Sequence, residues 1–319
     1  GGSLRVGPRS AGSEPGPACY GRGGTEASIT DANLLLGRLE PTLGGKMTLD
    51  REAAEKAVGK LAEQVGLSVL ETAEGMIKIS CESMAQAVKM VVVARGRDPR
   101  DFVLASFGGA GAMHAAFVAN AMNIPKMIVP AYAGVASAFG ATAMDLRQDV
   151  EAFMYAPLDS VDLAAVNATF ERLEKDARDL LAKDGVDAAD MTVVRTAQMR
   201  YVGQTYEVET PISMGVLSDS SLAELENTFH AQHKLEYGVS SDDFQPALVS
   251  LCVTATGATV APPPESGGAQ SDEEIKKGER QLYFDGEWFD SPVYNGEALS
   301  LGDKIAGPAI VEYTDACTV

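Results

Sequence analysis

An apolar run that ends in a glycine turn constrains the fold of this chain more than any other segment. Residues 102–130 read FVLASFGGAGAMHAAFVANAMNIPKMIVP. The stretches 102–107 and 126–130 are short apolar runs typical of buried parallel strands, and 112–122 has the small-residue pattern of a packed helix. The order strand, glycine turn, helix, strand predicts a right-handed βαβ unit and therefore an α/β fold.

The same glycine turn is the strongest candidate for a ligand site. Glycines let a ligand approach the backbone, and the amides that start the following helix can face an anion. The segment is not a Walker A loop, because no Lys-Ser/Thr follows the glycines. It half fits GxGxxG, because His114 stands where the third glycine should be. Close packing of the helix on the sheet explains the same glycines, and on shape alone it is the commoner explanation.

Composition limits the fold classes and the kinds of binding partner that the chain can have. The 319 residues are 45% hydrophobic and 22% charged, which suits two globular domains, and 32 glycines with only 6% aromatic residues suit many strand-to-helix turns. The formal net charge of −19 repels a phosphate backbone, so we expect no nucleic-acid partner. No apolar run is long enough to cross a bilayer, so we expect no membrane partner.

The cysteines and the first residues of the chain indicate the cellular compartment. Four cysteines are scattered singly, without a CxxC pair, which is typical of free thiols and does not support a disulfide framework or a four-thiolate zinc site. The front of the chain has no charged-then-apolar signal peptide. We therefore expect a cytoplasmic protein.

Periodicity predicts the remaining elements. Helical patterns occur in six further segments, at 31–39, 50–65, 68–95, 134–144, 160–183 and 218–237. Thr30 or Asp31 is the expected N-cap of the first, Asp50 that of the second, and the third is expected to break near Gly75. The buried face expected late in that third helix carries Ile79, Met84, Val88, Val91 and Val92. Strand patterns occur at 192–211, as a hairpin turning near Gly203, at 248–256, and in short pieces after residue 280.

After Val150 the glycine- and alanine-rich segments give way to a charged helical segment and alternating strand patterns. We therefore expect one domain over residues 1–152 and a mixed α+β domain over 153–319. A polar segment rich in proline and glycine, near 262–279, is expected to be a flexible connector within the second domain.

Several other side chains are candidate site residues. Cys19, in the opening segment VGPRSAGSEPGPACYGRGG, needs a base to act as a nucleophile, and Arg22 is a single nearby cation, so a packed thiol is the commoner explanation. Asp31 and Asn33 are most simply interpreted as a helix cap and a helix-surface residue, and ligand contacts are the second interpretation.

The histidines also have two interpretations each. A lone helical histidine such as His114 is more often packed than catalytic, although its place beside the glycine turn favours a hydrogen bond to a ligand. His230 and His233 share a helix face and could bind a metal, but no third histidine lies in this half of the chain, so a structural role is favoured.

Taken together, these segments resemble the hydantoinase A / 5-oxoprolinase family, in particular the C-terminal portion of an N-methylhydantoinase A-like subunit. The opening loop with TDANLLLGRL, and GRDPRDFVLASFGGAGAMHA, are similar to two of its most distinctive blocks. The later blocks MRYVGQTYEV, FHAQHKLEYG, VTATG, YFDGEWFDSPVY and GPAIVEYTDA follow in the family's order. Ala112 and Arg97 replace the family's usual Pro and Tyr, and neither change removes a glycine from the turn.

The resemblance implies that the chain is one portion of a longer subunit. Family members are roughly twice as long, so an N-terminal half with phosphate-binding turns would precede Gly1 and a tail would follow Val319. The implied fold is α/β, the second half of an actin-like (sugar kinase/heat-shock ATPase/actin) core followed by the α+β domain. In such cores the nucleotide lies between two subdomains. Residues 1–152 would then hold the adenosine-side subdomain.

The resemblance also implies cofactors and site residues. ATP and Mg²⁺ are expected, with Ser106, Gly108, Gly109 and Gly111 as the adenosine-side loop and His114 beside it. Arg22, Asp31 and Asn33 are expected on the substrate or interface side, and together with His114 they are the predicted catalytic residues. No residues are assigned to the metal.

The implied reaction is ATP-dependent hydrolysis of a cyclic amide. Phosphorylation of the carbonyl oxygen would turn it into a good leaving group, so that water opens the ring, and a hydantoinase B-type subunit would be the partner. Two alternatives remain open: a subunit of an ATP-dependent ketone carboxylase, and a non-catalytic assembly module for a partner subunit.

Overall fold

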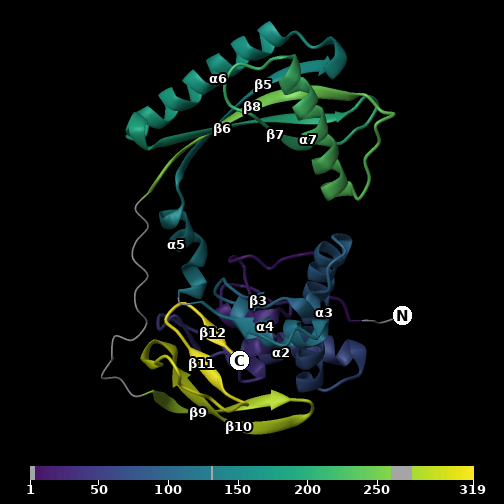
Figure 1. Cartoon of the computed structure of the whole chain (residues 1–319). Helices are drawn as coiled ribbons and strands as arrows, with labels where there is room; N and C mark the ends of the chain where they lie inside the picture. The colour runs from purple at the N-terminus through teal and green to yellow at the C-terminus, as the bar shows by residue number, and fades with distance from the viewer. Residues whose placement is uncertain (1–3, 131, 260–274) are drawn as a thin grey trace. The chain divides into compact units, whose positions relative to one another are not determined.

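The computed structural model describes residues 4–130, 132–259 and 275–319, which belong to two compact units (Figure 1). Unit 1 comprises Gly1–Ala141 and Pro263–Val319, and unit 2 comprises Thr142–Pro262. Of the connector expected at 262–279, residues 262–274 lie outside the described residues, and residues 276–279 belong to a strand.

Four helices build most of unit 1: α1 (Ile29–Leu35), α2 (Arg51–Val65), α3 (Val69–Ala94) and α4 (Gly111–Met122). Side chains cap the first three, since Ser28, Asp50 and Ser68 each accept a hydrogen bond from a first-turn N–H. Their apolar faces share one core, which includes Leu35, Val58, Ile77, Ala85 and Val118. A minor hairpin, β1 (Thr42–Leu43) and β2 (Met47–Thr48), links α1 to α2.

Two expectations for α3 are wrong. The helix runs through Gly75 without a break, because a capping box formed by Ser68 and Glu71 fixes its start and one glycine costs only about 1 kcal/mol. Its buried residues lie in its first seventeen positions, up to Ala85. Of the residues expected on the buried face, Val88 packs against the core, whereas Met84 and Val91 are 37% and 58% exposed, because no other described element covers them.

The predicted βαβ unit is confirmed in its pairing but not in its burial. Strand β3 (Leu104–Ala105) pairs in parallel with β4 (Met127–Ile128), and α4 lies between them in sequence. Both strands are shorter than expected, and no third strand joins the pair in the described residues. Phe102, Val103 and Phe107 are therefore exposed, where the sequence predicted a buried strand. The following helix, α5 (Ala136–Ala143), lies within the expected 134–144.

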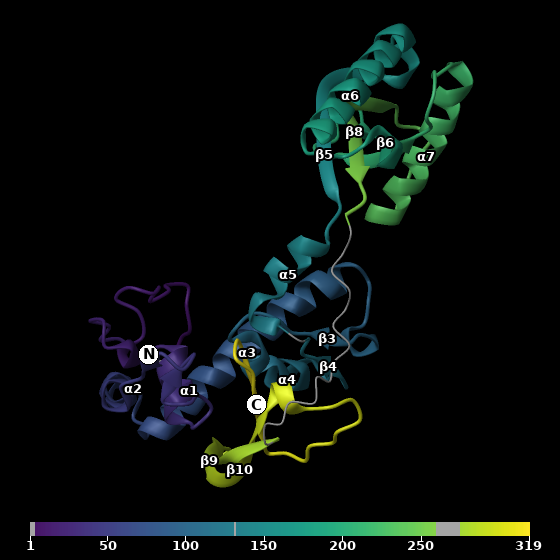
Figure 2. The same cartoon turned by 90° about the vertical axis from the view of Figure 1, so that its left-hand side faces the viewer.

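The last described residues form a four-stranded sheet that belongs to unit 1 (Figure 2). Its strands are β9 (Lys276–Phe284), β10 (Glu287–Asn295), β11 (Ile310–Glu312) and β12 (Cys317–Thr318). The Tyr283 N–H donates to the Leu36 carbonyl, and Gln281 packs so closely on Gly37 that a Cβ there would clash. These contacts place the end of the chain with α1, whereas the sequence grouped it with residues 153–274.

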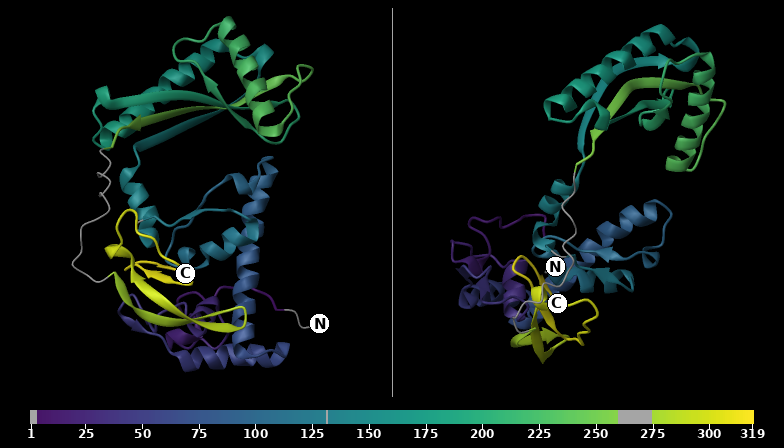
Figure 3. Two further views of the ribbon diagram at one scale, coloured as in Figure 1. Left: turned by 60° about the horizontal axis from the view of Figure 1, so that its bottom comes forward. Right: turned by 60° about the vertical axis from the view of Figure 1, so that its left-hand side comes forward.

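Unit 2 is an antiparallel sheet with helices packed on one face (Figure 3). The strand order is β5-β8-β6-β7, from β5 (Leu146–Pro157), β6 (Met191–Tyr201), β7 (Val208–Ile212) and β8 (Pro246–Gly257). Helices α6 (Leu163–Lys183) and α7 (Asp219–Tyr237) share its core. The hairpin expected at 192–211 is confirmed as β6 and β7, and the strand β5 was not predicted.

The opening segment is ordered by one carboxylate. Asp31 is fully buried and accepts hydrogen bonds from the N–H groups of Ala18, Cys19 and Ser28 and from the Ser28 hydroxyl. The N-cap of α1 is therefore Ser28, not Thr30 or Asp31, and Asp31 closes the capping box from the third helical position. Burial and the neighbouring Asp31 raise the pKa of the buried Cys19 thiol, which favours the packed thiol over a nucleophile.

Replacing Asp31 with alanine should release the opening segment. The substitution leaves buried N–H groups without an acceptor, and we expect it to cost roughly 3 kcal/mol of the free energy of unfolding. Trypsin should then cleave faster after the exposed Arg22. The measurement is limited proteolysis with mass mapping of the first cut.

Asp50→Ala is the matched control, because it removes a single cap bond from α2 and should leave the rate of cleavage at Arg22 near the wild-type value. Equal cleavage rates in the Asp31→Ala variant and the wild type would show that the segment is held by other contacts.

Candidate functional site

The glycine turn follows β3 directly and is held at both ends by backbone hydrogen bonds. Ser106 N–H donates to the Ile128 carbonyl at 2.9 Å, and Gly108 N–H donates to the Ala133 carbonyl at 2.6 Å. Gly108 has a φ of +91°, a conformation that other residues rarely adopt. At Gly111 an added Cβ would lie 3.0 Å from Ser106 Oγ, so both glycines serve the fold itself.

Gly109 differs from its neighbours. Its φ is not positive, and a Cβ there would meet the Asp315 carbonyl oxygen at 3.5 Å, an ordinary contact. The fold therefore does not require a glycine at this position. The residue is exposed. A glycine that the backbone does not need is consistent with close approach of a ligand.

The start of α4 offers unpaired donors. Ala110, its N-cap, makes no side-chain cap bond, and within the described part of the chain no acceptor receives the N–H of Gly109 or Ala110. Both residues are exposed. Backbone donors at the positive end of a helix dipole are a suitable arrangement for an anion.

An acidic side chain that sequence reasoning missed lies beside this turn. Asp315, between β11 and β12, accepts a hydrogen bond from Gly134 N–H at 2.9 Å. Gly134 lies so close to Asp315 that it has no room for a Cβ. Thr314 N–H donates to the Glu297 carboxylate at 2.6 Å, which helps to hold this segment. No sequence spacing signals the contact, because Gly134 and Asp315 are 181 positions apart.

The structure brings two of the predicted catalytic residues together. Asn33 Nδ2 lies 3.3 Å from His114 Nε2, although the residues are 81 positions apart. Asn33 Nδ2 also donates to the Ile29 carbonyl, which fixes the orientation of the amide. His114 Nε2 is therefore the acceptor, and its Nδ1 carries the proton that faces Cys81 Sγ at 3.8 Å.

A buried cation lies beside this cluster. The guanidinium of Arg38 is buried, 4.4 Å from the Phe117 ring centroid and 5.3 Å from that of Phe284. Its Nε and Nη1 have no hydrogen-bond partner among the described residues. Burial lowers the pKa of Arg38 to about 10, still above physiological pH, so the cation persists.

The cluster is not an activated nucleophile. Burial, with Arg38 as a second cause, lowers the pKa of His114 to about 4. Burial raises the pKa of Cys81 to about 11, even though Arg38 opposes the shift. Both groups are therefore neutral near pH 7, and a Cys–His–Asn arrangement of this kind contains no thiolate. The arrangement favours packing of α1, α3 and α4 over proton transfer.

The other two predicted catalytic residues lie elsewhere. Arg22 is exposed in the opening segment and makes no hydrogen bond to Asn33 or His114. All four hydrogen bonds that the Asp31 carboxylate accepts come from residues of the opening segment and the helix cap. The structure therefore groups Asn33 with His114, and Asp31 with the loop.

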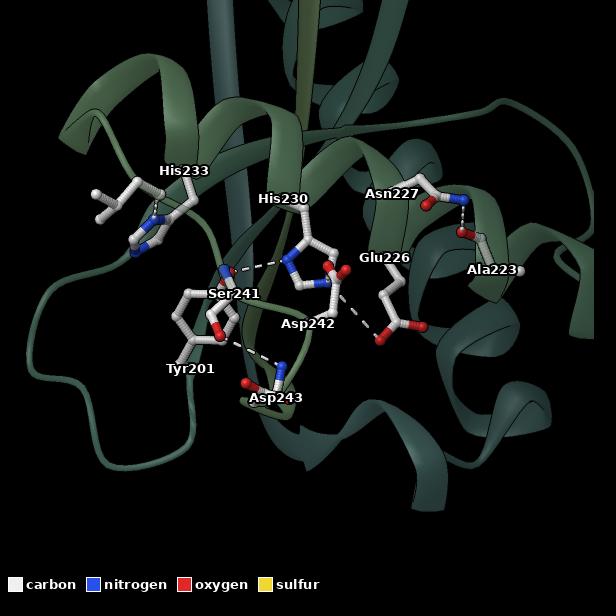
Figure 4. A network of polar contacts seen from close by, with 10 residues as sticks. Tyr201, Ala223, Glu226, Asn227, His230, His233, Ser241, Asp242 and Asp243 are labelled. Carbon is white, nitrogen blue, oxygen red and sulfur yellow. Dashed lines mark hydrogen bonds and ion pairs between the residues drawn. The ribbon is translucent and has the colours of Figure 1, made fainter.

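The other two histidines, His230 and His233, belong to a network in unit 2 (Figure 4). Ser241 N–H donates to the Tyr201 hydroxyl, so the Tyr201 proton is directed to His230 Nδ1 at 2.8 Å. His233 Nδ1 lies 2.6 Å from the Val239 carbonyl, and its Nε2 faces Gln204. In the described ranges no group of three or more His, Cys, Asp or Glu residues is placed to hold a metal ion. The network ties the segment after α7 to β6.

None of the described helices combines the length and the apolar character needed to cross a membrane.

Comparison with known proteins gives consistent matches along the chain. A family model described as Hydantoinase/oxoprolinase matches residues 1–150, and one described as Hydantoinase/oxoprolinase C-terminal domain matches residues 159–319. The caprolactamase subunit alpha of Pseudomonas jessenii is 37% identical over 98% of this chain and 46% of its own length. The acetophenone carboxylase gamma subunit of Aromatoleum aromaticum is 34% identical over 97% of this chain and 44% of its own.

Two solved structures match nearly the whole chain. The nucleotide-free structure of acetone carboxylase, which carries out ATP-dependent acetone carboxylation, has a TM-score of 0.80 at 25% identity, over 99% of this chain and 47% of that one. The crystal structure of the ATP-dependent caprolactamase from Pseudomonas jessenii has a TM-score of 0.78 at 36% identity, with the same coverage. The chain thus spans about half the length of these four proteins.

The buried His114 predicts a component of acid sensitivity in unit 1. Because the folded state lowers its pKa from 6.5 to about 4, the neutral form is favoured, and this stabilisation is complete above pH 6.5 and lost as the pH falls toward 4. A shift of this size corresponds to roughly 3 kcal/mol. His114→Gln should therefore lose less free energy of unfolding than the wild type between about pH 7.5 and pH 4.5.

Urea titrations followed by the fluorescence of Trp288, which lies in unit 1, measure this difference. Met113→Leu is the control, since it changes a buried, non-titrating neighbour and should shift stability equally at both pH values. Parallel pH profiles for the wild type and His114→Gln would contradict the assignment.

Proposed function

The chain belongs to the hydantoinase/oxoprolinase family, and from that premise we propose that it is part of an ATP-dependent subunit that activates the carbonyl oxygen of a cyclic amide for ring opening by water. The ATP-dependent caprolactamase of 36% identity supports this reaction class. Several relatives are named subunits, which supports assembly with a second, hydantoinase B-type chain.

The main observation that supports a nucleotide site is that, among the described residues, the N–H groups of Gly109 and Ala110 have no acceptor at the uncapped start of α4. We place the nucleotide against this turn, where the donors would bind an anionic or polar group and the absent side chain at Gly109 would allow close approach. ATP would supply the phosphoryl group. Near the turn Asp315 is the carboxylate that fits a role toward Mg²⁺, so phosphates and water would supply most of the metal's ligands.

Exposed apolar residues support completion of the site by further protein. Phe102, Val103 and Phe107 flank the two-stranded β3–β4 pair, Ile128 belongs to β4, and the four side chains are 41–60% exposed. Such a pair is marginal without additional strands or a covering layer. We expect the chain alone to bind ATP weakly or not at all, and not to hydrolyse it.

Ketone carboxylation is the second candidate, favoured by the match to acetone carboxylase with a TM-score of 0.80 and by the acetophenone carboxylase relative. A third candidate is an assembly module with no catalytic role. This candidate would agree with a nucleotide site that needs further protein to complete it.

Gly109→Val in the complete subunit should abolish ATP hydrolysis, because its branched side chain would enter the nucleotide path. The fold tolerates a Cβ there, so near-UV and far-UV circular dichroism should remain unchanged. The control is Gly140→Val, since a Cβ at Gly140 has open space around it. If Gly109→Val retains ATP hydrolysis with unchanged nucleotide affinity, the proposed position of the nucleotide at this turn is wrong.

Turnover assays with the complete complex separate the candidate reactions. We expect ATP hydrolysis that depends on a lactam or cyclic imide and yields the ring-opened acid. Hydrolysis that requires bicarbonate and a ketone would instead establish the carboxylase. Equilibrium dialysis of the isolated chain with labelled ATP addresses the third candidate, because strong binding would argue against a purely structural role.

A further inference from the structure

In unit 2 the ring of His230, on α7, lies between a hydroxyl group and two carboxylates (Figure 4). On one side its Nδ1 accepts the Tyr201 hydroxyl proton at 2.8 Å. On the other side its Nε2 lies 3.9 Å from Glu226 Oε1 and 3.9 Å from Asp242 Oδ1. Because Nδ1 is an acceptor, the neutral ring carries its proton on Nε2, which is too far from either carboxylate for a hydrogen bond.

The Tyr201 hydroxyl connects His230 to the segment after α7. Tyr201 comes from β6 and is buried. Its hydroxyl donates to His230 and accepts from Ser241 N–H at 3.0 Å. Conjugation keeps a phenolic O–H in the plane of its ring, so the proton occupies one in-plane position and leaves the other to an incoming donor. The two bonds therefore use both in-plane positions of the oxygen.

Protonation of His230 is incompatible with this arrangement. An imidazolium carries a proton on each nitrogen, so Nδ1 becomes a donor that faces the Tyr201 proton. The hydroxyl must then turn to its other in-plane position, where its oxygen accepts from Nδ1 and its proton points at Ser241 N–H. Two donors face each other there, so the bond between Ser241 and Tyr201 is lost.

The same protonation creates an attraction on the opposite side of the ring. The charged Nε2–H of His230 faces Glu226 and Asp242 at ion-pair distance. Asp242 directly follows Ser241, and its side chain is 99% exposed, so no packing keeps it from moving closer. Lys234, one turn further along α7, is exposed. The segment thus loses a backbone bond and gains an ion pair at the next residue.

His233, the other titratable ring of the network, holds the start of this segment. Gln204 Oε1 accepts from Tyr201 N–H, so Gln204 Nε2 donates to His233 Nε2 at 3.1 Å. His233 Nδ1 therefore carries a proton and donates to the Val239 carbonyl at 2.6 Å. An imidazolium keeps the proton on Nδ1, so acid would cost His233 its contact with Gln204 but not its bond to Val239. The rearrangement is therefore confined to residues beyond Val239.

We propose that His230 is a proton-sensitive switch for the surface segment 241–244. With a neutral ring Tyr201 holds Ser241, and with a charged ring this bond is replaced by the ion pair of Asp242. Phe244 moves with the segment, since it is 59% exposed and its ring centroid lies 5.9 Å from that of Tyr201. The apolar surface of unit 2 would thus change in the interval where histidine titrates, about pH 5 to 8. The proposal is independent of the ATP-dependent reaction and of the nucleotide position.

NMR of the isotope-labelled chain between about pH 8 and pH 5.5 tests the switch. The chain has three histidines, and His230→Gln identifies the ring signal of His230. The Ser241 amide should leave its hydrogen-bonded chemical shift with the same midpoint as this ring signal. Its protection against hydrogen exchange, corrected for the intrinsic effect of pH, should fall at least about tenfold, because a bond worth about 1.4 kcal/mol corresponds to that factor.

Two substitutions separate the switch from a general effect of acid. Tyr201→Phe removes the hydroxyl and keeps the ring, so His230 should still titrate while the Ser241 amide no longer follows it. Asp242→Asn should move the Ser241 transition to lower pH, because it removes a charge that favours the imidazolium. Asp243→Asn is the matched control and should leave the transition in place, since no ion pair joins Asp243 to His230 in the described residues.

The proposal fails if the His230 ring titrates while the Ser241 amide stays unchanged, or if the ring does not titrate in this interval. It also fails if a folded Tyr201→Phe variant shows the same Ser241 transition as the wild type. The wild-type titration decides the matter even if the variants do not fold.

Discussion

The buried guanidinium of Arg38 is the interaction on which the arrangement of unit 1 depends. It lies between Phe117 of α4 and Phe284 of β9, and the Arg38 carbonyl accepts a contact from Cys317 Sγ at 3.6 Å. Burying an unpaired charge costs several kcal/mol, and cation–π contact offsets about 2 kcal/mol or more at a desolvated site. Three segments far apart in sequence are thereby held around one cation, and this cation adds to the burial that keeps His114 neutral.

This convergence explains how the end of the chain reaches the glycine turn. Strand β9 packs on the turn after α1, and the segment between β11 and β12 carries Asp315 to the glycine turn. At the turn itself, Gly108 and Gly111 are explained by backbone conformation and by Ser106, so they say little about a ligand. Gly109 has no such explanation, which makes it the more informative residue.

Local patterns predicted local structure well. The Asp50 cap, the helices α2, α6 and α7, the β6–β7 hairpin and the parallel β3–β4 pairing follow from capping, periodicity and turn residues in the sequence. The strand β5 was missed because its alternation includes charged residues, and it pairs at an edge of its sheet. Burial of Phe102 and Val91 was predicted from hydrophobicity, which cannot show whether a covering element is present. The contact of Asp315 with Gly134, and the position of Arg38, depend on long-range packing that no spacing encodes.

The division of the chain has a topological consequence. Unit 1 is interrupted after Ala141 and resumes at Pro263, so unit 2 is an insertion within it. Leu146, at the start of β5, pairs with Gly257, at the end of β8, so the two ends of the inserted sheet are adjacent. Neighbouring strands lie only about 5 Å apart, a gap that a very short linker closes. A short linker across that gap would therefore allow unit 2 to be removed without cutting the core that surrounds Arg38.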